Sequence, residues 1–212
     1  MVSARRKKSS RFLPVLCRRF GASRDGAAAI EFAVLALPFF LLLFATIEVF
    51  VAFAGEQMLN HTTDQISRDI RLGKITFDTG RQTDMDQVEF HEHFCSELVV
   101  LVTCDDAGGS RLFLDVRNVD NFSDVPIGVP RAGGSLDTSD FGFDIGGAGD
   151  IHVFRAFYKW PVLTDLIRPY LANIDNGDGI PEYYLMVSTT AFRNEPFAVR
   201  GGSGGSGGSG GT

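Results

Sequence analysis

One apolar run near the N-terminus constrains this chain more than any other feature. From Phe32 to Ile47 no side chain is charged or strongly polar, and the apolar character resumes after Glu48. At about 1.5 Å per helical residue, residues 30–54 span roughly 36 Å, which is enough to cross the hydrocarbon layer of a bilayer. Because lipid offers the backbone no hydrogen-bond partner, the run is expected to be helical. The sequence therefore predicts a transmembrane helix over residues 27–54.

A secretory signal is the alternative interpretation of the same run. Ala52, Phe53 and Ala54 provide the small-residue pattern of a signal cleavage site. The run is much longer than the usual stretch of about 7–15 apolar residues, and it contains carboxylates. A retained anchor is the preferred interpretation.

The charges divide sharply at the start of this run. Residues 1–26 hold eight of the 20 Lys and Arg residues and one of the 26 acidic residues, which leaves a net charge of −13 on the remainder. Because basic residues stay on the cytoplasmic side of a first membrane helix, we expect a cytoplasmic leader and an exported acidic domain. A nucleic-acid-binding arm is the other possible use of a basic tail. The adjoining span already accounts for the basic residues, so no nucleic-acid partner is expected.

The three cysteines fit this topology. Cys17 lies in the leader, whereas Cys95 and Cys104 lie in the expected exported domain. Thiols in an oxidising periplasm form disulfides, so Cys95 and Cys104 are expected to pair. On the chain-entropy model, closing this short loop stabilises the domain by about 2.5–3 kcal/mol.

Two carboxylates interrupt the apolar run. Glu48 lies near its distal end, where a wetted helix end explains it. Glu31 lies one turn inside the proximal end, where a carboxylate in lipid is costly unless its side chain reaches the headgroups. Asp25, Gly26 and a series of small residues precede Glu31, after a basic leader.

This arrangement resembles the N-terminus of type IV prepilins and pseudopilins. Those proteins have a basic leader ending in glycine, then an apolar helix with glutamate as its fifth residue. Gly26 matches the last leader residue, Ala27 the new N-terminus and Glu31 the fifth residue. The form GAAAIEFA, with ATIEVF further along, resembles the TadE-like pseudopilins of tight-adherence (Flp-type) pilus systems. VFRAFYKWP (residues 153–161) and TTAFRNEPF (residues 189–197) also resemble that family.

The resemblance implies a function in pilus assembly rather than catalysis. It implies cleavage after Gly26 by a prepilin peptidase, before Ala27, and a role for Glu31 in assembly. The implied location is the inner membrane, crossed once, with a cytoplasmic N-terminus and a periplasmic C-terminal domain. The implied partners are the peptidase, other pilins and pilus assembly proteins, with no cofactor. A structural role is expected for the family motif Arg193, Asn194, Glu195 and Pro196.

Residues 55–200 are expected to form an α+β, pilin-like domain. Apolar residues continue at helical spacing to about Leu72, and Gly73 is the expected end of the helix. Four segments have the β-branched and aromatic composition of strands: residues 98–103, 112–118, 151–160 and 183–192. These strands predict a small antiparallel sheet on which the N-terminal helix packs. Residues 120–150 are expected to be a long irregular loop, and residues 201–212 a flexible Gly/Ser linker.

Two segments have the composition of metal sites. His91, Glu92, His93 and Cys95 would share zinc-ligand chemistry if alternate residues faced one side of a strand, but a polar turn or helix end before a disulfide is preferred. Residues 173–179 resemble a calcium loop, yet the glycine required at position 6 of an EF-hand is Asp178 here. A tight turn is the preferred interpretation, with weak calcium binding left open, and no metal site is predicted.

Two functions follow from these features. The first is a minor pilin-like component of a tight-adherence pilus, trimmed after Gly26. The second is a permanent single-pass membrane protein whose periplasmic domain binds a ligand or scaffolds an envelope complex. Trimming of the leader distinguishes them.

Overall fold

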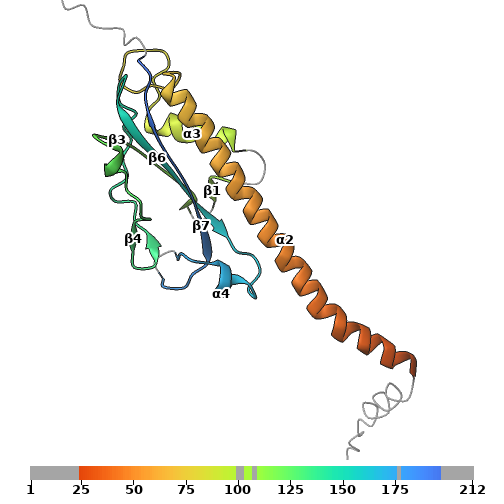
Figure 1. Cartoon of the computed structure of the whole chain (residues 1–212). Coiled ribbons are helices and arrows are strands. Elements are labelled where there is room, and N and C mark those ends of the chain that lie inside the picture. Colours follow the sequence, from red (N-terminus) through yellow and green to blue (C-terminus); the bar gives the residue numbers. More distant parts are fainter. Residues whose placement is uncertain (1–23, 99–102, 107–108, 176–177, 197–212) are drawn as a thin grey trace, which may run out of the picture. The chain divides into compact units, whose positions relative to one another are not determined.

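The computed structural model describes residues 24–98, 103–106, 109–175 and 178–196, and it divides the chain into two compact units. The first unit is Met1–Ile47 and the second is Glu48–Thr212. A single long helix, α2 (Arg24–Arg71), contributes to both (Figure 1). In the first unit it is the only element that the described residues form. The sheet belongs wholly to the second unit.

The end of α2 agrees with the sequence. Gly73 adopts a positive φ of 68°, which costs glycine little. The amide of Gly73 donates to the Ile70 carbonyl and that of Lys74 to the Asp69 carbonyl, at 2.9 Å each. These two bonds form a Schellman cap, which satisfies carbonyls that the helix end would otherwise leave unpaired.

The main sheet has three antiparallel strands in the order β3-β6-β7. They are β3 (Leu112–Val119), β6 (Ile151–Pro161) and β7 (Tyr183–Arg193). The central strand β6 is buried along nearly its whole length, because both faces of the sheet are covered. The predicted α+β, pilin-like fold, a long N-terminal helix on a small antiparallel sheet, is confirmed.

Alternation along β6 divides the core into two layers. Phe154, Ala156, Tyr158 and Trp160 belong to a cluster with buried residues of α2, including Leu59 and Ile66. Phe157 belongs to a second cluster with Leu136, Ile174 and Leu185, of which Leu185 lies on the neighbouring strand β7. Since successive side chains of a strand point to opposite faces, one strand serves both layers.

Gly55 lets α2 approach the sheet closely. A Cβ at this position would lie 2.7 Å from the Trp160 ring, nearer than real Cβ atoms come to a neighbour. The Trp160 ring therefore packs directly on the backbone of the helix.

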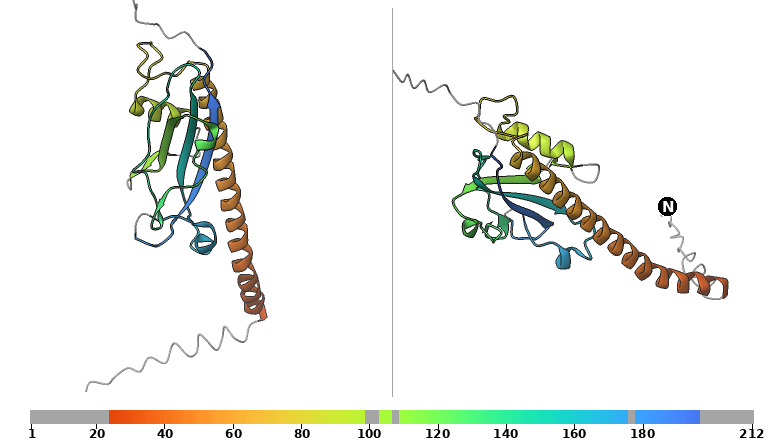
Figure 2. Two further views of the ribbon diagram at one scale, coloured as in Figure 1. Left: turned by 60° about the vertical axis from the view of Figure 1, so that its left-hand side comes forward. Right: turned by 45° about the horizontal axis from the view of Figure 1, so that its top comes forward.

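A second helix, α3 (Gln87–Glu97), packs on the same layer as α2 (Figure 2). Its Phe90 and Phe94 rings lie 5.7 and 5.8 Å from the Phe154 ring, in edge-on contacts. A capping box begins it: Asp86 accepts from the amides of Val88 and Glu89, and Glu89 accepts from the amide of Asp86.

Short elements complete the domain. They are β1 (Asp105–Asp106), β2 (Gly109–Ser110), η1 (Phe122–Asp124), β4 (Arg131–Ala132), β5 (Ser135–Leu136) and α4 (Arg168–Leu171). β1 pairs with β2, and β4 with β5. The loop expected over residues 120–150 therefore contains a small hairpin.

Three of the four expected strands are present, each within one residue of its predicted ends. The fourth, over residues 98–103, falls largely on residues 99–102, which lie outside the described residues. The helical residues 87–97 were not predicted. The sequence signal for them was the capping box Asp86-x-x-Glu89, which precedes the apolar pair Phe90 and Phe94.

Candidate functional site

The residues expected to be processed lie in the first turn of α2. The helix begins at Arg24, so the peptide bond between Gly26 and Ala27 is part of that turn. Amides in the first turn have no partner within the helix, so opening this turn breaks few hydrogen bonds. Ala27 and Glu31 are both exposed and four residues apart, which puts them on one helix face.

From Ile30 onward, the helix exposes apolar side chains around its whole circumference. In the first unit the large exposed ones are Ile30, Phe32, Val34, Leu35, Leu37, Phe39, Phe40, Leu41, Leu42, Leu43, Phe44 and Ile47. Water does not favour such a surface, whereas lipid or another apolar helix does. Within the described residues, one helix is long and apolar enough to cross a membrane, and its place near the N-terminus also fits a signal sequence.

Glu48 does more than end this apolar run. Its carboxylate accepts from the amide of Leu163 at 2.6 Å and from the amide of Thr164 at 3.0 Å. These amides follow β6, 115 and 116 residues along the chain. The expectation of a simple wetted helix end is therefore corrected: Glu48 fastens the segment after β6 to α2.

Glu56 makes a second link between α2 and the sheet. Its carboxylate accepts from the Tyr184 hydroxyl at 3.2 Å. Partial burial raises the pKa of that phenol, and the charge of Glu56 raises it further. Tyr184 therefore stays protonated and keeps its donor for this bond.

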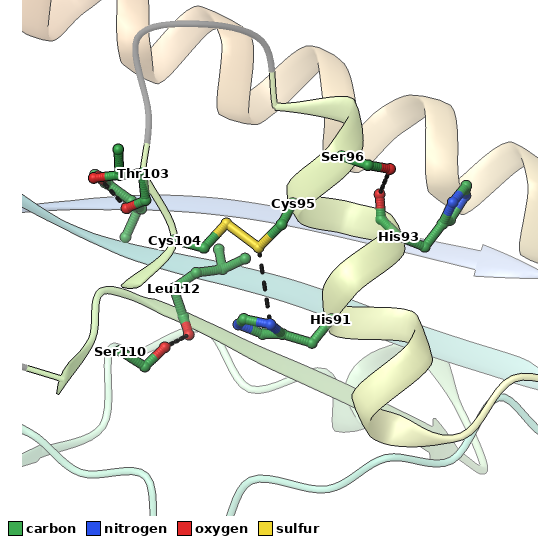
Figure 3. The surroundings of a disulfide bond; sticks show 9 residues. His91, His93, Cys95, Ser96, Thr103, Cys104, Ser110 and Leu112 are labelled. Atoms are coloured by element: carbon green, nitrogen blue, oxygen red, sulfur yellow. Dashed lines mark hydrogen bonds between the residues drawn. A yellow bond between two sulfur atoms is a disulfide. The ribbon is translucent and has the colours of Figure 1, made fainter. Parts of the chain in front are cut away.

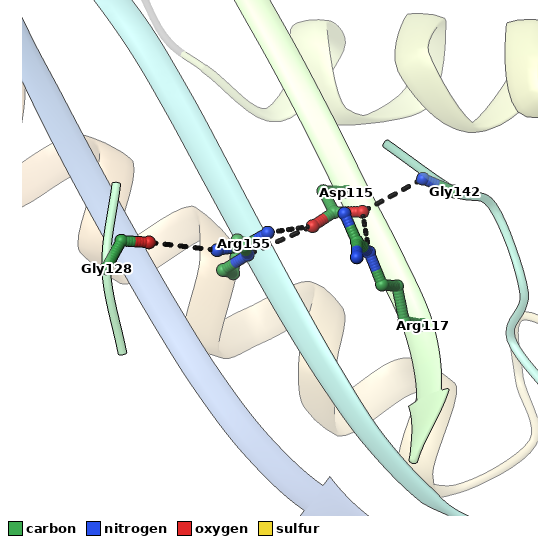
Figure 4. Close-up of polar contacts among 5 residues, drawn as sticks. All are labelled: Asp115, Arg117, Gly128, Gly142 and Arg155. Atoms are coloured by element: carbon green, nitrogen blue, oxygen red, sulfur yellow. Dashed lines mark hydrogen bonds and ion pairs between the residues drawn. The ribbon is translucent and has the colours of Figure 1, made fainter. Parts of the chain in front are cut away.

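A buried ion pair lies at the centre of the other face of the sheet (Figure 4). The Arg155 guanidinium donates to Asp115 through Nε and Nη2, and to the Gly128 carbonyl. Asp115 also accepts from Arg117 Nε at 2.6 Å and from the Gly142 amide at 2.9 Å. With every charge paired, the cluster joins β3, β6 and the long loop, which is a structural use of a buried carboxylate.

The predicted disulfide joins α3 to the chain before β1 (Figure 3). Cys95 and Cys104 are bonded, with their Cα atoms 6.1 Å apart. His91 lies one turn before Cys95, with Nδ1 3.8 Å from its sulfur. The segment is helical, so the arrangement in which alternate residues share a strand face is wrong. Among the described residues no group of three His, Cys, Asp or Glu side chains is placed to hold a metal.

His152 is fully buried on β6. Burial lowers the pKa of its imidazole, although the nearby charges of Asp144 and Asp150 act in the opposite direction. Gly146 is needed beside it, because a Cβ there would lie 2.3 Å from the ring. The ring packs against Phe192.

The segment before β7 is tied to the sheet as a turn. The Asn173 side chain accepts from the Leu185 amide at 2.9 Å, and the Ile174 amide donates to the Tyr183 carbonyl. Ser135 donates to the buried Asp175 carboxylate at 2.6 Å. Residues 176 and 177 of the segment that resembles a calcium loop lie outside the described part of the chain.

A shallow cavity of about 280 Å³ lies between α3, β3 and the long loop. Phe90, Phe113 and Phe143 form much of its wall, with His91 and Gln87 as polar neighbours. It falls just below the range of about 300–1,000 Å³ that is usual for small-molecule sites.

Three consecutive residues of the motif at the end of β7 make hydrogen bonds or an ion pair with other parts of the domain. Arg193 donates to the Gly149 carbonyl at 2.7 Å. The buried side chain of Asn194 donates to the carbonyls of Ile145 and Gly147. Glu195 forms an ion pair with Arg71 at 3.1 Å, and its amide donates to the Arg71 carbonyl.

One family model, described as TadE-like protein, matches residues 26–68. This segment is similar to the TadE-like family. The match covers most of α2, begins at Gly26 and includes Glu31, Glu48 and Gly55, so the resemblance suggested by the sequence is confirmed there. It ends before the sheet, and the later segments at residues 153–161 and 189–197 lie outside it. No curated protein and no solved structure matched the chain.

The TadE-like family is associated with Tad pilus assembly, and its members are generally non-enzymatic pilus components. For this chain the match itself is limited to residues 26–68.

Proposed function

We propose that this protein is a minor pilin-like component for assembly of a tight-adherence pilus. The observation that carries the proposal is the TadE-like match over residues 26–68, which falls on one continuous helix. The first part of that helix exposes mainly apolar side chains, and its last part contributes to the core of a sheet domain. A pilin needs both parts: an apolar helix for the membrane or the fibre, and a folded head.

The proposed location is the inner membrane, crossed once, with the N-terminus in the cytoplasm. The basic residues before Gly26 favour this orientation, because they resist export. The disulfide between Cys95 and Cys104 fits a periplasmic domain, since such bonds persist in oxidising compartments.

A prepilin peptidase is the proposed processing partner, acting between Gly26 and Ala27. Cleavage would leave an ammonium on Ala27, four residues before Glu31. Helical residues with this spacing are neighbours, and a helix N-terminus favours a nearby negative charge. Within one subunit the two charges would therefore attract each other.

Glu31 is proposed to act in assembly with other pilins. Its exposed carboxylate is surrounded by exposed apolar side chains, where a lone charge in lipid costs about 2.5–3.5 kcal/mol at the centre and less near an end. Pairing with the N-terminal ammonium of a neighbouring subunit would remove that cost. A variant without the carboxylate would insert normally but lose this reason to dock.

Two substitutions test the proposal in cells that make the pilus. Gly26→Val should block trimming and leave full-length protein in the inner membrane, as seen by blotting and by intact mass. Glu31→Ala should be inserted and at least partly trimmed, yet fail to support piliation.

Asp64→Ala, which removes an exposed carboxylate from the same helix outside the apolar run, is the matched control and should leave both readouts unchanged. Normal piliation by Glu31→Ala would contradict the assembly role, and an untrimmed wild-type protein would favour a permanent single-pass protein instead.

A further inference from the structure

Exposed apolar side chains gather after the end of β6. Leu163 and Tyr170 are 81% and 89% exposed, and Leu166 also faces solvent. All three lie on residues 162–172, the segment that includes α4, which lies at the end of the sheet where β6 stops and β7 begins (Figure 1). We call this segment the α4 foot. Leu163 and Tyr170 therefore present most of their surface, and Leu166 about half of its surface, to solvent.

Glu48 sets the position of the α4 foot along the helix. Its carboxylate holds the amides of Leu163 and Thr164, so the foot begins at the level of residue 48. Glu48 is also the residue that directly follows the uninterrupted apolar run ending at Ile47. The foot is therefore fastened one residue past that run.

The apolar surface of α2 continues for more than a turn beyond Glu48. Val49, Phe50 and Phe53 are exposed and apolar. At about 1.5 Å per residue, Phe53 lies roughly 7.5 Å further along the helix axis than Glu48. The headgroup layer on each side of a bilayer is about 5–7 Å thick, so with Phe53 at its outer edge Glu48 would lie close to the boundary of the hydrocarbon layer.

We propose that the α4 foot lies in the outer headgroup layer of the phospholipid bilayer, with Leu163, Leu166 and Tyr170 inserted among the lipids. This inference rests on the proposed membrane anchoring. Tyrosine is enriched at such interfaces because its ring is apolar and its hydroxyl stays wet, and leucine provides the buried apolar area. The bonds from two amides to Glu48 satisfy a carboxylate at a depth where water is scarce.

The charges of the foot indicate which lipids it needs. Arg168 is paired with Asp165 at 2.8 Å, so the foot carries no surplus positive charge from these two residues. Binding to anionic lipid requires clustered Lys and Arg residues, which segment 162–172 lacks. Insertion should therefore be the same in neutral and in anionic bilayers.

The test uses the full chain in lipid nanodiscs with a fluorescent probe at single positions. In a Cys17→Ser background, an environment-sensitive dye is placed by Leu163→Cys, Phe40→Cys or Ile127→Cys and quenched by nitroxide-labelled lipids. Labelling without reductant leaves the Cys95–Cys104 disulfide unreactive. All three positions are exposed in the domain or helix, so none of the changes removes core packing.

Position 40 should be quenched strongly, because it reports the membrane span itself. Position 163 should be quenched several-fold more than position 127, a fully exposed residue of the long loop that serves as the matched control. Adding Glu48→Ala should reduce the quenching at position 163 and leave that at position 40 unchanged. Anionic lipid should change neither.

Two outcomes distinguish a failure of the α4 foot inference from a failure of the proposed membrane anchoring. Quenching at position 40 with none above the control at position 163 would overturn the foot and leave the anchor intact; it would point to a protein partner for the patch. No quenching at position 40 would overturn the anchoring itself. Equal quenching at position 163 with and without Glu48 would overturn the fastening by that carboxylate.

Discussion

At the residue scale, Asp115 shows how this domain keeps a charge in its interior. The carboxylate and its partner Arg155 are almost completely buried, and they face each other across the paired strands β3 and β6. The Arg155 guanidinium also lies 5.3 Å from the centre of the Phe157 ring. A buried ion pair is costly to desolvate, so its value lies in the additional bonds that it makes to the loop at Gly128 and Gly142.

Arg155→Met should lower the free energy of unfolding by about 3 kcal/mol, because it leaves the Asp115 carboxylate buried with only the partly exposed Arg117 as counter-ion. The double variant Asp115→Leu/Arg155→Met should recover part of that loss, since it removes the uncompensated charge as well. Urea unfolding followed by near-ultraviolet circular dichroism, at neutral pH in detergent, measures both. If the double variant is no more stable than the single one, the loss of stability comes from the missing bonds to the loop rather than from the uncompensated charge of Asp115.

At the element scale, α3 depends on contacts far from it in sequence. Its buried residues are Phe90 and Phe94, whose rings meet Phe154 of β6. A helix of 11 residues is marginal in water, so this packing and the capping box must hold it. The disulfide from Cys95 fastens its last turn to the chain before β1.

Replacing both cysteines, Cys95→Ser/Cys104→Ser, should lower the free energy of unfolding by about 2.5 kcal/mol through the entropy that the open loop regains in the unfolded chain. Thermal unfolding of the oxidised wild type and the double variant measures the difference. Maleimide labelling of denatured, unreduced protein taken from the periplasmic side is the control, and it should leave both wild-type thiols unmodified. Reaction of both thiols would show that the disulfide does not form in the cell.

At the scale of the whole molecule, the end of β7 closes the sheet domain onto the end of α2. The Glu195 amide and carboxylate both meet Arg71, while the Asn194 side chain holds the loop at Ile145 and Gly147. Asn194 is 3% exposed, whereas both side chains of the ion pair are about half exposed. The motif residue with most influence on stability should therefore be the uncharged one.

Asn194→Ala should lower the free energy of unfolding by about 2 kcal/mol, because two carbonyls lose their donor in a buried place. Glu195→Ala should cost less than about 0.5 kcal/mol, because solvent screens an exposed pair and the backbone bond to Arg71 remains. Urea titrations of the two variants side by side provide the comparison. Equal losses would mean that the ion pair is stronger than its exposure indicates.

Several features of this protein follow from the sequence alone, because neighbouring residues decide them. The length of the apolar run, the helical spacing up to Leu72, the stop at Gly73 and the β-branched and aromatic composition of the three long strands all depend on residues close together in the chain. The TadE-like segment belongs to the same class, since its motif lies within a single helix. Sequence periodicity reports such features directly.

Only the tertiary structure decided the features that join distant parts of the chain. Glu48 lies 115 residues from the Leu163 amide that it accepts from, and Asn194 lies 49 residues from the Ile145 carbonyl to which it donates. Asp115 and Arg155 meet because of strand register. Read in sequence order, each is an ordinary polar residue. Its partner is set by how helix, strands and loops pack, because the cost of burying a polar group is met by whichever donor or acceptor the fold brings beside it.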